Sequence, residues 1–229
     1  MLDRRWREKA ELALEPAGKA LHVVGVSADG LTVFGLFAAA GTAVLIANGN
    51  LLLAVFGMIL TGLPDLLDGS VARQSGTAGR RGAFFDSVCD RVADALLLGG
   101  VAWHFTSESA ELPILALAVV ALSMLVSYER AKAEALGLSA RGGMMERAER
   151  MVLLGVGLAF DILVPVLWIM LVLTALTAAH RFVMVWRQAT HDDAPSPPVA
   201  TDDHSSGRPR SLRGRRTRPR RLPRVSGRR

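Results

Sequence analysis

The fold is decided between residues 51 and 103, which read LLLAVFGMILTGLPDLLDGSVARQSGTAGRRGAFFDSVCDRVADALLLGGVAW. This stretch holds two long apolar runs, 51–67 and 83–103, and a basic connection at 73–81 joins them. An α-helix needs about 20 apolar residues to cross the roughly 30 Å of hydrocarbon in a bilayer. The stretch therefore predicts two membrane-spanning helices that run antiparallel and lie side by side.

The same pattern continues on both sides of this stretch. Of the 229 residues 51% are hydrophobic. Many of them lie in long apolar runs, which are unusual in a soluble domain. The further apolar runs are 31–47, 112–126, 151–160 and 164–179. Together the six runs predict an all-α integral membrane protein with six transmembrane helices.

Basic residues alternate between the connections. The connections 48–50, 104–111 and 161–165 contain no Lys or Arg, whereas 73–81, 130–150 and the two ends of the chain contain many basic residues, most of them Arg. Basic residues are retained on the cytoplasmic side of a membrane. The alternation therefore predicts that both termini and the two basic connections are cytoplasmic, in the cell membrane.

The two ends of the chain differ from the apolar body. Residues 3–24 have apolar side chains at helical spacing among charges, which predicts an amphipathic helix in the membrane interface. Residues 188–229 contain 11 Arg and 4 Asp, with few apolar residues, and are expected to form a disordered cytoplasmic tail. The net charge of +6 lies in this tail, so it does not indicate a nucleic-acid-binding domain. The predicted division is a membrane domain at 1–187 and a tail at 188–229.

Four aspartates lie where the two central helices approach the basic connection. Asp65 and Asp68 are spaced i, i+3 at the end of one run, and Asp86 and Asp90 are spaced i, i+4 at the start of the next. Each pair lies on one helical face, so the four carboxylates can converge at the cytoplasmic interface. Mutual repulsion makes such a cluster costly, and hard divalent cations such as Mg²⁺ or Mn²⁺ are the usual remedy. The sequence thus predicts a divalent-metal site.

These residues carry a resemblance to a known family. The pattern D-x2-D-G-x2-A-R-x8-G-x3-D-x3-D runs from Asp65 to Asp90 with all eight fixed positions matched. It resembles the signature of the CDP-alcohol phosphotransferases, which are phosphatidyltransferases, and the resemblance covers roughly 15–187. It implies an enzyme, commonly a homodimer, that transfers a phosphatidyl group from CDP-diacylglycerol to an alcohol and releases CMP.

The resemblance also implies roles for individual residues. Asp90 would be the general base that takes the proton from the acceptor hydroxyl. It would also be one of four aspartates that coordinate the metal. The implied metal ligands are Asp65, Asp68, Asp86 and Asp90. The implied contacts with the cytidine diphosphate group are Asp29, Thr32, Asp68, Gly69, Ala72, Arg73, Gly79 and Gly82. Gly79 stands where the family usually has Thr.

The acceptor is indicated by the second basic connection. Residues 127–134 and 142–150 resemble the actinobacterial phosphatidylinositol phosphate synthases, which implies inositol 1-phosphate as acceptor. A cluster of basic side chains suits an acceptor with its own phosphate, and the candidates are Arg130, Lys132, Arg147 and Arg150. Two alternatives stay open: glycerol 3-phosphate as acceptor, and a divalent-cation transporter in place of an enzyme.

Overall fold

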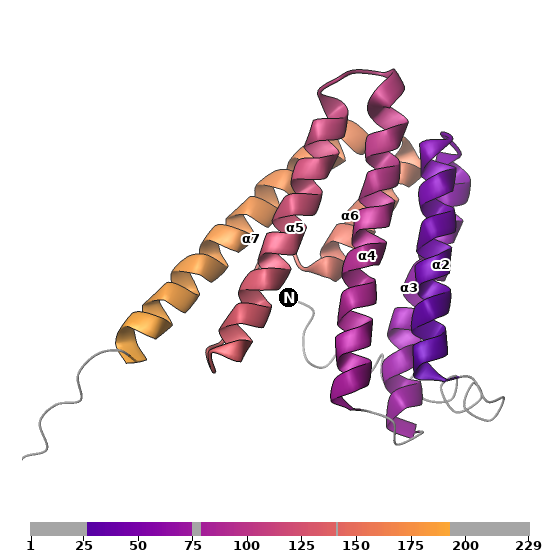
Figure 1. Ribbon diagram of the computed structural model, residues 1–229. Coiled ribbons are helices and arrows are strands. Elements are labelled where there is room, and N and C mark those ends of the chain that lie inside the picture. Colours follow the sequence, from indigo (N-terminus) through magenta and orange to yellow (C-terminus); the bar gives the residue numbers. More distant parts are fainter. Residues whose placement is uncertain (1–26, 75–78, 141, 193–229) are drawn as a thin grey trace, which may run out of the picture. The chain divides into compact units, whose positions relative to one another are not determined.

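The computed structural model describes residues 27–74, 79–140 and 142–192, with side chains described except at 65–74, 191 and 192. In this part of the chain every regular element is helical, and no strand is present. The elements are α2 (Ala28–Ala47), α3 (Leu51–Gln74), α4 (Arg80–His104), the short 3-10 helix η1 (Phe105–Ser107), α5 (Leu112–Ala135), α6 (Arg147–Phe160) and α7 (Leu163–Asp192) (Figure 1). The predicted all-α class is confirmed for these residues. The interfacial helix predicted at 3–24 lies outside them.

Three of the described helices, α2, α5 and α7, are long and apolar enough to cross a membrane. Helix α3 has a shorter apolar part, Leu51–Pro64. Helix α6 has 14 residues, which span only about 21 Å at 1.5 Å per residue. Helix α4 carries three carboxylates, Asp86, Asp90 and Asp94. The helices support a membrane protein, whereas the count of six spans stays a prediction.

The second basic connection is shorter than predicted. Helix α5 continues to Ala135 and α6 begins at Arg147, so Arg130 and Lys132 lie on a helix and not in a loop. The residues that follow the apolar part of α5 are mainly Ala, Glu, Lys and Arg. These are strong helix formers, so the helix continues beyond the apolar run.

Sharp reversals of the chain separate the helices. After α2, Asn48 donates a side-chain hydrogen bond to the Val44 carbonyl (2.8 Å) and Gly49 adopts a φ of +76°. After α6, Asp161 adopts a left-handed conformation with a φ of +53°, which Asp tolerates better than most residues. Figure 1 shows the α2–α3 and α4–α5 connections at the same end of their helices.

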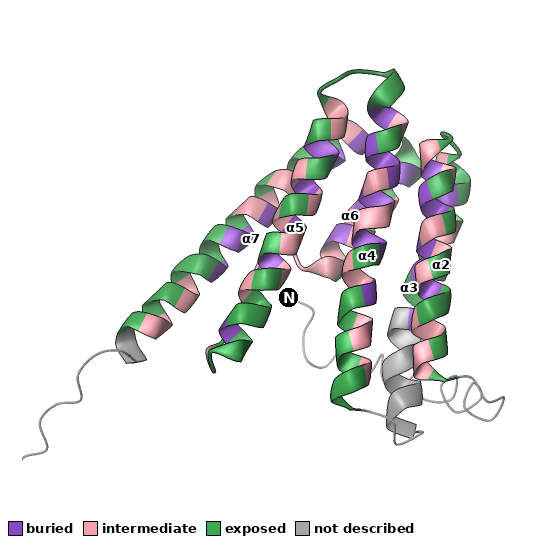
Figure 2. Cartoon of the chain, in the orientation of Figure 1, coloured by how far each residue is buried: buried purple, intermediate pink, exposed green. Residues whose placement is uncertain are grey.

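The packing leaves one end of helix α4 open. Helix α2 packs against α3 and α4, α5 packs against α4 and α7, and α6 packs against α3 and α7. The buried core includes Ile46, Leu97, Leu98, Val101, Val119, Leu154, Leu158, Leu167 and Met170. On α4 the buried positions run only from Cys89 to Ala102, and Figure 2 shows the N-terminal turns as a mixture of exposed and intermediate residues. The first two turns of α4 therefore hold no buried residue, and Asp86 is partly exposed.

Gly100 allows α4 to approach α2 closely. A Cβ at this position would lie 2.6 Å from the Ala43 carbonyl oxygen and 2.9 Å from the Ala43 Cα. Gly100→Ala is therefore expected to lower the free energy of unfolding by about 1–3 kcal/mol through overpacking. Gly99→Ala is the matched control, since a Cβ there meets no described atom within 4 Å. Apparent melting temperatures in detergent check this, and equal values for the two variants would contradict the close packing.

Candidate active site

Asp86 and Asp90 lie one turn apart on the same face of helix α4. Both are partly buried, and the Asp90 side chain is 17% exposed. Asp90 Oδ1 lies 2.8 Å from Arg147 Nη1, and Asp90 Oδ2 lies 3.2 Å from Arg91 Nη1. Two ion pairs therefore orient the Asp90 carboxylate, one of them from a different helix.

The other half of the predicted aspartate cluster lies on helix α3. The α3 backbone is helical as far as Gln74, and α4 begins six residues later. Beyond its backbone, the structure does not describe residues 65–74, which include Asp65, Asp68, Gly69, Ala72 and Arg73. Among the side chains that are described, no three His, Cys, Asp or Glu residues gather into a metal-binding group. The convergence of all four aspartates therefore stays a prediction.

The described pair fits one side of a divalent-metal site. Asp86 and Asp90 supply carboxylate oxygens, which are the donors that Mg²⁺ and Mn²⁺ take in proteins. They lie about two to three turns after the N-terminus of α4, and the turns of α4 before Cys89 contain no buried residue. The donor chemistry and the access are both those that a metal bound to a phosphate requires.

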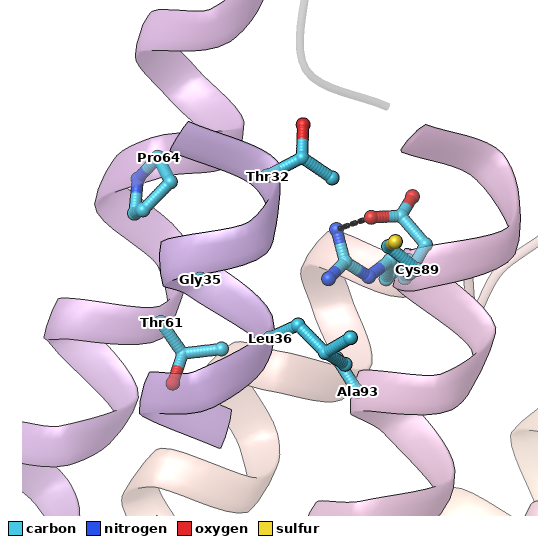
Figure 3. Close-up of a pocket in the computed structure, with 9 residues that line it drawn as sticks. Thr32, Gly35, Leu36, Thr61, Pro64, Cys89 and Ala93 are labelled. Atoms are coloured by element: carbon cyan, nitrogen blue, oxygen red, sulfur yellow. Dashed lines mark ion pairs between the residues drawn. The ribbon is translucent and has the colours of Figure 1, made fainter. Parts of the chain in front are cut away.

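Thr32 and Asp90 line the same small cavity, and Figure 3 shows Thr32 at this cavity. The Thr32 hydroxyl donates to the Ala28 carbonyl at 3.2 Å. The cavity has a volume of about 20 Å³ and is lined by Thr32, Gly35, Leu36, Thr61, Pro64, Cys89, Asp90, Ala93 and Arg147. The structure thus brings a predicted nucleotide contact, Thr32, to the same cavity as the predicted base, Asp90.

Three more predicted nucleotide contacts lie around the start of α4. The Asp29 carboxylate is 3.5 Å from the guanidinium of Arg81, which is itself almost fully exposed. Gly79 is the N-terminal cap of α4 in an extended conformation. A Cβ built on Gly82 would meet no described atom within 4 Å. The described residues therefore leave open space at Gly82, as a nucleotide-binding position requires.

A second, more polar cavity adjoins Asp90 on the other side. It has a volume of about 190 Å³ and is lined by residues of α4, α5, α7, the start of α6 and the connection before it. These residues are Asp90, Arg91, Asp94, Val126, Ser127, Arg130, Glu146, Arg147, Ala148, Glu149, Arg150 and Arg181. Five arginines surround a space large enough for a small anion, so the cavity is a candidate phosphate site.

Three of the four predicted acceptor residues line this cavity. They are Arg130, Arg147 and Arg150. Arg130 is half exposed and pairs with Glu134 at 3.1 Å on the same helix; such exposed pairs contribute only about 0.3–0.5 kcal/mol. A bound phosphate could therefore compete for Arg130 at little cost. Lys132 is exposed on α5 and is not among the lining residues.

Arg181 belongs to the cavity and was absent from the prediction. It is 3% exposed, and its three guanidinium nitrogens donate to the Gly142 carbonyl (2.9 Å), the Val126 carbonyl (3.0 Å) and Glu146 Oε1 (3.1 Å). One sequence signal pointed to it: Arg181 interrupts a run that is apolar again from Phe182 to Trp186. A charge inside an apolar helix usually faces a polar interior and serves a function.

Most of the chain matches one known protein family. A sequence model described as CDP-alcohol phosphatidyltransferase matches residues 26–190. The chain belongs to the CDP-alcohol phosphatidyltransferase family. The family predicted from the pattern between Asp65 and Asp90 is therefore confirmed.

Several members of the CDP-alcohol phosphatidyltransferase family with similar sequences are named phosphatidylinositol phosphate synthase. The phosphatidylinositol phosphate synthase of Mycobacterium marinum is 35% identical over 210 residues, which cover 86% of this chain and 89% of the relative. The crystal structure of the Mycobacterium tuberculosis phosphatidylinositol phosphate synthase with CDP-DAG bound has a TM-score of 0.70 and 31% identity, and the match covers 76% of this chain and 93% of that one. A second structure of that enzyme, in complex with manganese and citrate, has a TM-score of 0.69 at 31% identity, covering 76% and 88%.

Proposed function

We propose that this phosphatidyltransferase moves the phosphatidyl group of CDP-diacylglycerol to a hydroxyl of inositol 1-phosphate, giving phosphatidylinositol phosphate and CMP. The observation that carries the proposal is the arginine-lined cavity of about 190 Å³ next to Asp90. An acceptor with a phosphate of its own needs such a cavity beside the reacting group, and an uncharged alcohol does not. The relatives are named for the same product, phosphatidylinositol phosphate, which supports the proposal.

The proposed chemistry begins at the Asp90 carboxylate. The acceptor phosphate lies in the cavity against Arg147 and its neighbours, which places a ring hydroxyl near Asp90. An Asp90 oxygen takes the hydroxyl proton, the acceptor oxygen forms a bond to the phosphorus that carries diacylglycerol, and the bond from that phosphorus to CMP breaks. Positioning the hydroxyl in this way replaces a bimolecular encounter, which can supply several kcal/mol of the barrier.

The metal ligands in this proposal are Asp65, Asp68, Asp86 and Asp90. A divalent ion held by them would neutralise charge on the diphosphate of the donor and on the departing CMP. Manganese in the structure of the Mycobacterium tuberculosis relative supports this requirement. Thr32, Asp29, Gly79 and Gly82, with the residues of α3 from Asp68 to Arg73, are proposed to contact the cytidine diphosphate.

The membrane arrangement is part of the proposal. Six spans with both termini cytoplasmic would put the basic connections, and with them the active site, on the cytoplasmic side. The three apolar helices α2, α5 and α7 support a location in the membrane. The membrane domain is proposed at 1–187, with the tail following it, although α7 continues to Asp192. A homodimer is proposed from the family resemblance.

The acceptor can be tested with purified protein in detergent, Mn²⁺ or Mg²⁺ and CDP-diacylglycerol. Inositol 1-phosphate, glycerol 3-phosphate, free inositol and serine would be supplied separately while CMP release is followed. We expect CMP release with inositol 1-phosphate and none without divalent metal. Release with glycerol 3-phosphate instead would keep the mechanism and replace the acceptor. Release with none of the four would contradict the proposed function.

Gly82 offers a test of the nucleotide site. Gly82→Ala adds one methyl group to open space, so the protein should fold with equal or slightly greater stability, because Ala is the better helix former. If cytidine diphosphate approaches this position, kcat/KM for CDP-diacylglycerol should fall by about 10- to 100-fold. Gly99→Ala is the control, on the same helix and also in open space. Unchanged donor kinetics in Gly82→Ala would remove Gly82 from the site.

A further inference from the structure

Asp94 is a buried carboxylate that the reaction described above does not use. Its side chain is 5% exposed and lies on α4 one turn beyond Asp90. Its Oδ1 lies 3.1 Å from Arg147 Nε, and its Oδ2 lies 2.8 Å from Arg150 Nη2. Both oxygens are thus occupied by arginines from the first turn of α6.

The two arginines depend on Asp94 to different degrees. Arg147 is held between two carboxylates one turn apart, because its Nη1 pairs with Asp90 and its Nε with Asp94. Arg150 is 3% exposed, and Asp94 is the one carboxylate that pairs with it among the described residues. The Arg150 Nε is buried and donates to no described group. A buried cation whose counter-charge is removed is strongly destabilised, so Asp94 determines where the Arg150 guanidinium lies.

The pairs also bridge a gap between helices. Helices α4 and α6 do not pack backbone to backbone, since α6 packs against α3 and α7 instead. The long side chains of Arg147 and Arg150 cross the space to reach α4. Asp94 and both arginines line the 190 Å³ cavity. The carboxylate therefore orients the guanidinium groups at the wall where an anion would bind.

From this geometry we propose that Asp94 is a positioning residue that presents Arg147 and Arg150 to the phosphate of the acceptor and thereby sets the affinity for the acceptor. The proposal rests on the proposed function, because it assumes a phosphorylated acceptor in this cavity. Asp94 lies a turn beyond Asp90 and pairs only with the two arginines among the described residues. Its loss should therefore affect acceptor binding and leave donor binding in place.

The test uses the full-length protein with Asp94→Asn and Asp94→Glu, and Asp161→Asn as a distant control of the same chemical change. Asn keeps the size of Asp but loses the charge, whereas Glu keeps the charge on a longer stem. We expect Asp94→Asn to raise the KM for inositol 1-phosphate by about tenfold or more, with the KM for CDP-diacylglycerol changed less than about twofold. Asp94→Glu should give a smaller rise. Calorimetric titration of inositol 1-phosphate into the Mn²⁺- and CDP-loaded protein should show the same order of dissociation constants.

Several outcomes would overturn the proposal. One is a loss of thermal stability or kcat in Asp94→Asn with the acceptor KM and dissociation constant unchanged; another is an equal rise in both substrate KM values. If Asp94→Asn does not fold, Asp94→Glu decides, and an unchanged acceptor KM in that variant contradicts the proposal. If the wild-type protein uses glycerol 3-phosphate, only the choice of acceptor is refuted. The role of Asp94 can then be tested by comparing the KM for glycerol 3-phosphate between Asp94→Asn and the wild type.

Discussion

Replacing Asp90 by Asn is expected to lower kcat by about three orders of magnitude or more while the protein stays folded. An amide cannot accept the hydroxyl proton as a carboxylate does, and general-base catalysis alone contributes about 10²–10⁴-fold. Asn is also a weaker ligand for a divalent ion. The substitution therefore removes the general base and weakens metal binding at the same time. Turnover of CDP-diacylglycerol at saturating inositol 1-phosphate measures the effect.

The structure predicts that this loss is not due to unfolding. In Asp90→Asn the Arg147 guanidinium loses its 2.8 Å partner but keeps the pair with Asp94 at 3.1 Å. The melting temperature should therefore stay within a few degrees of the wild type. Asp161→Asn, on the αL cap of α6, makes the same chemical change away from the cavity and should retain full activity. A variant of Asp90 that turns over within tenfold of the wild type would contradict its role as base.

Arg181→Met should produce the largest loss of stability among single substitutions around the cavity. Met keeps much of the volume of the side chain but leaves the Gly142 and Val126 carbonyls and the Glu146 carboxylate without their donor. Removing one partner of a buried ion pair costs about 3–5 kcal/mol. The apparent melting temperature should fall by roughly 5–15 °C. Acceptor affinity should fall as well, because Arg181 lines the cavity.

Arg187→Met is the control for this substitution. Arg187 lies on the same helix but is exposed, and no ion pair involves it among the described residues. Its replacement should change the melting temperature by no more than a degree or two. Equal stability of Arg181→Met and Arg187→Met would show that the three hydrogen bonds of Arg181 do not stabilise the fold. Thermal unfolding of both proteins in the same detergent makes the comparison.

The helices could be predicted from the sequence because a membrane imposes long apolar runs. The run 112–126 begins with α5 at Leu112, and the run 151–160 ends with α6 at Phe160. The ends that extend beyond the apolar residues could not be found in the same way. Helix α3 continues to Gln74 and α5 to Ala135, where helix propensity and packing, rather than hydropathy, maintain the helix.

The candidate site was predictable where its residues share one helix or one short connection. Asp86 and Asp90 needed only the helical period to be placed together. Asp94 and Arg181 instead acquire their roles from partners 53 to 56 and 35 to 55 residues away, and no local pattern contains that information. Lys132 shows the converse: its charge and its neighbours suggested the acceptor site, but it is not among the residues that line the cavity.

The most direct test of the account is the identity of the lipid that the purified protein makes. The protein would be incubated with CDP-diacylglycerol, Mn²⁺ and an equimolar mixture of inositol 1-phosphate and free inositol, and the lipids would be analysed by mass spectrometry. We expect phosphatidylinositol phosphate, formed with one CMP per lipid and absent with Asp90→Asn. Phosphatidylinositol without the second phosphate, made from free inositol, would contradict the assignment of the arginine-lined cavity to the phosphate of the acceptor.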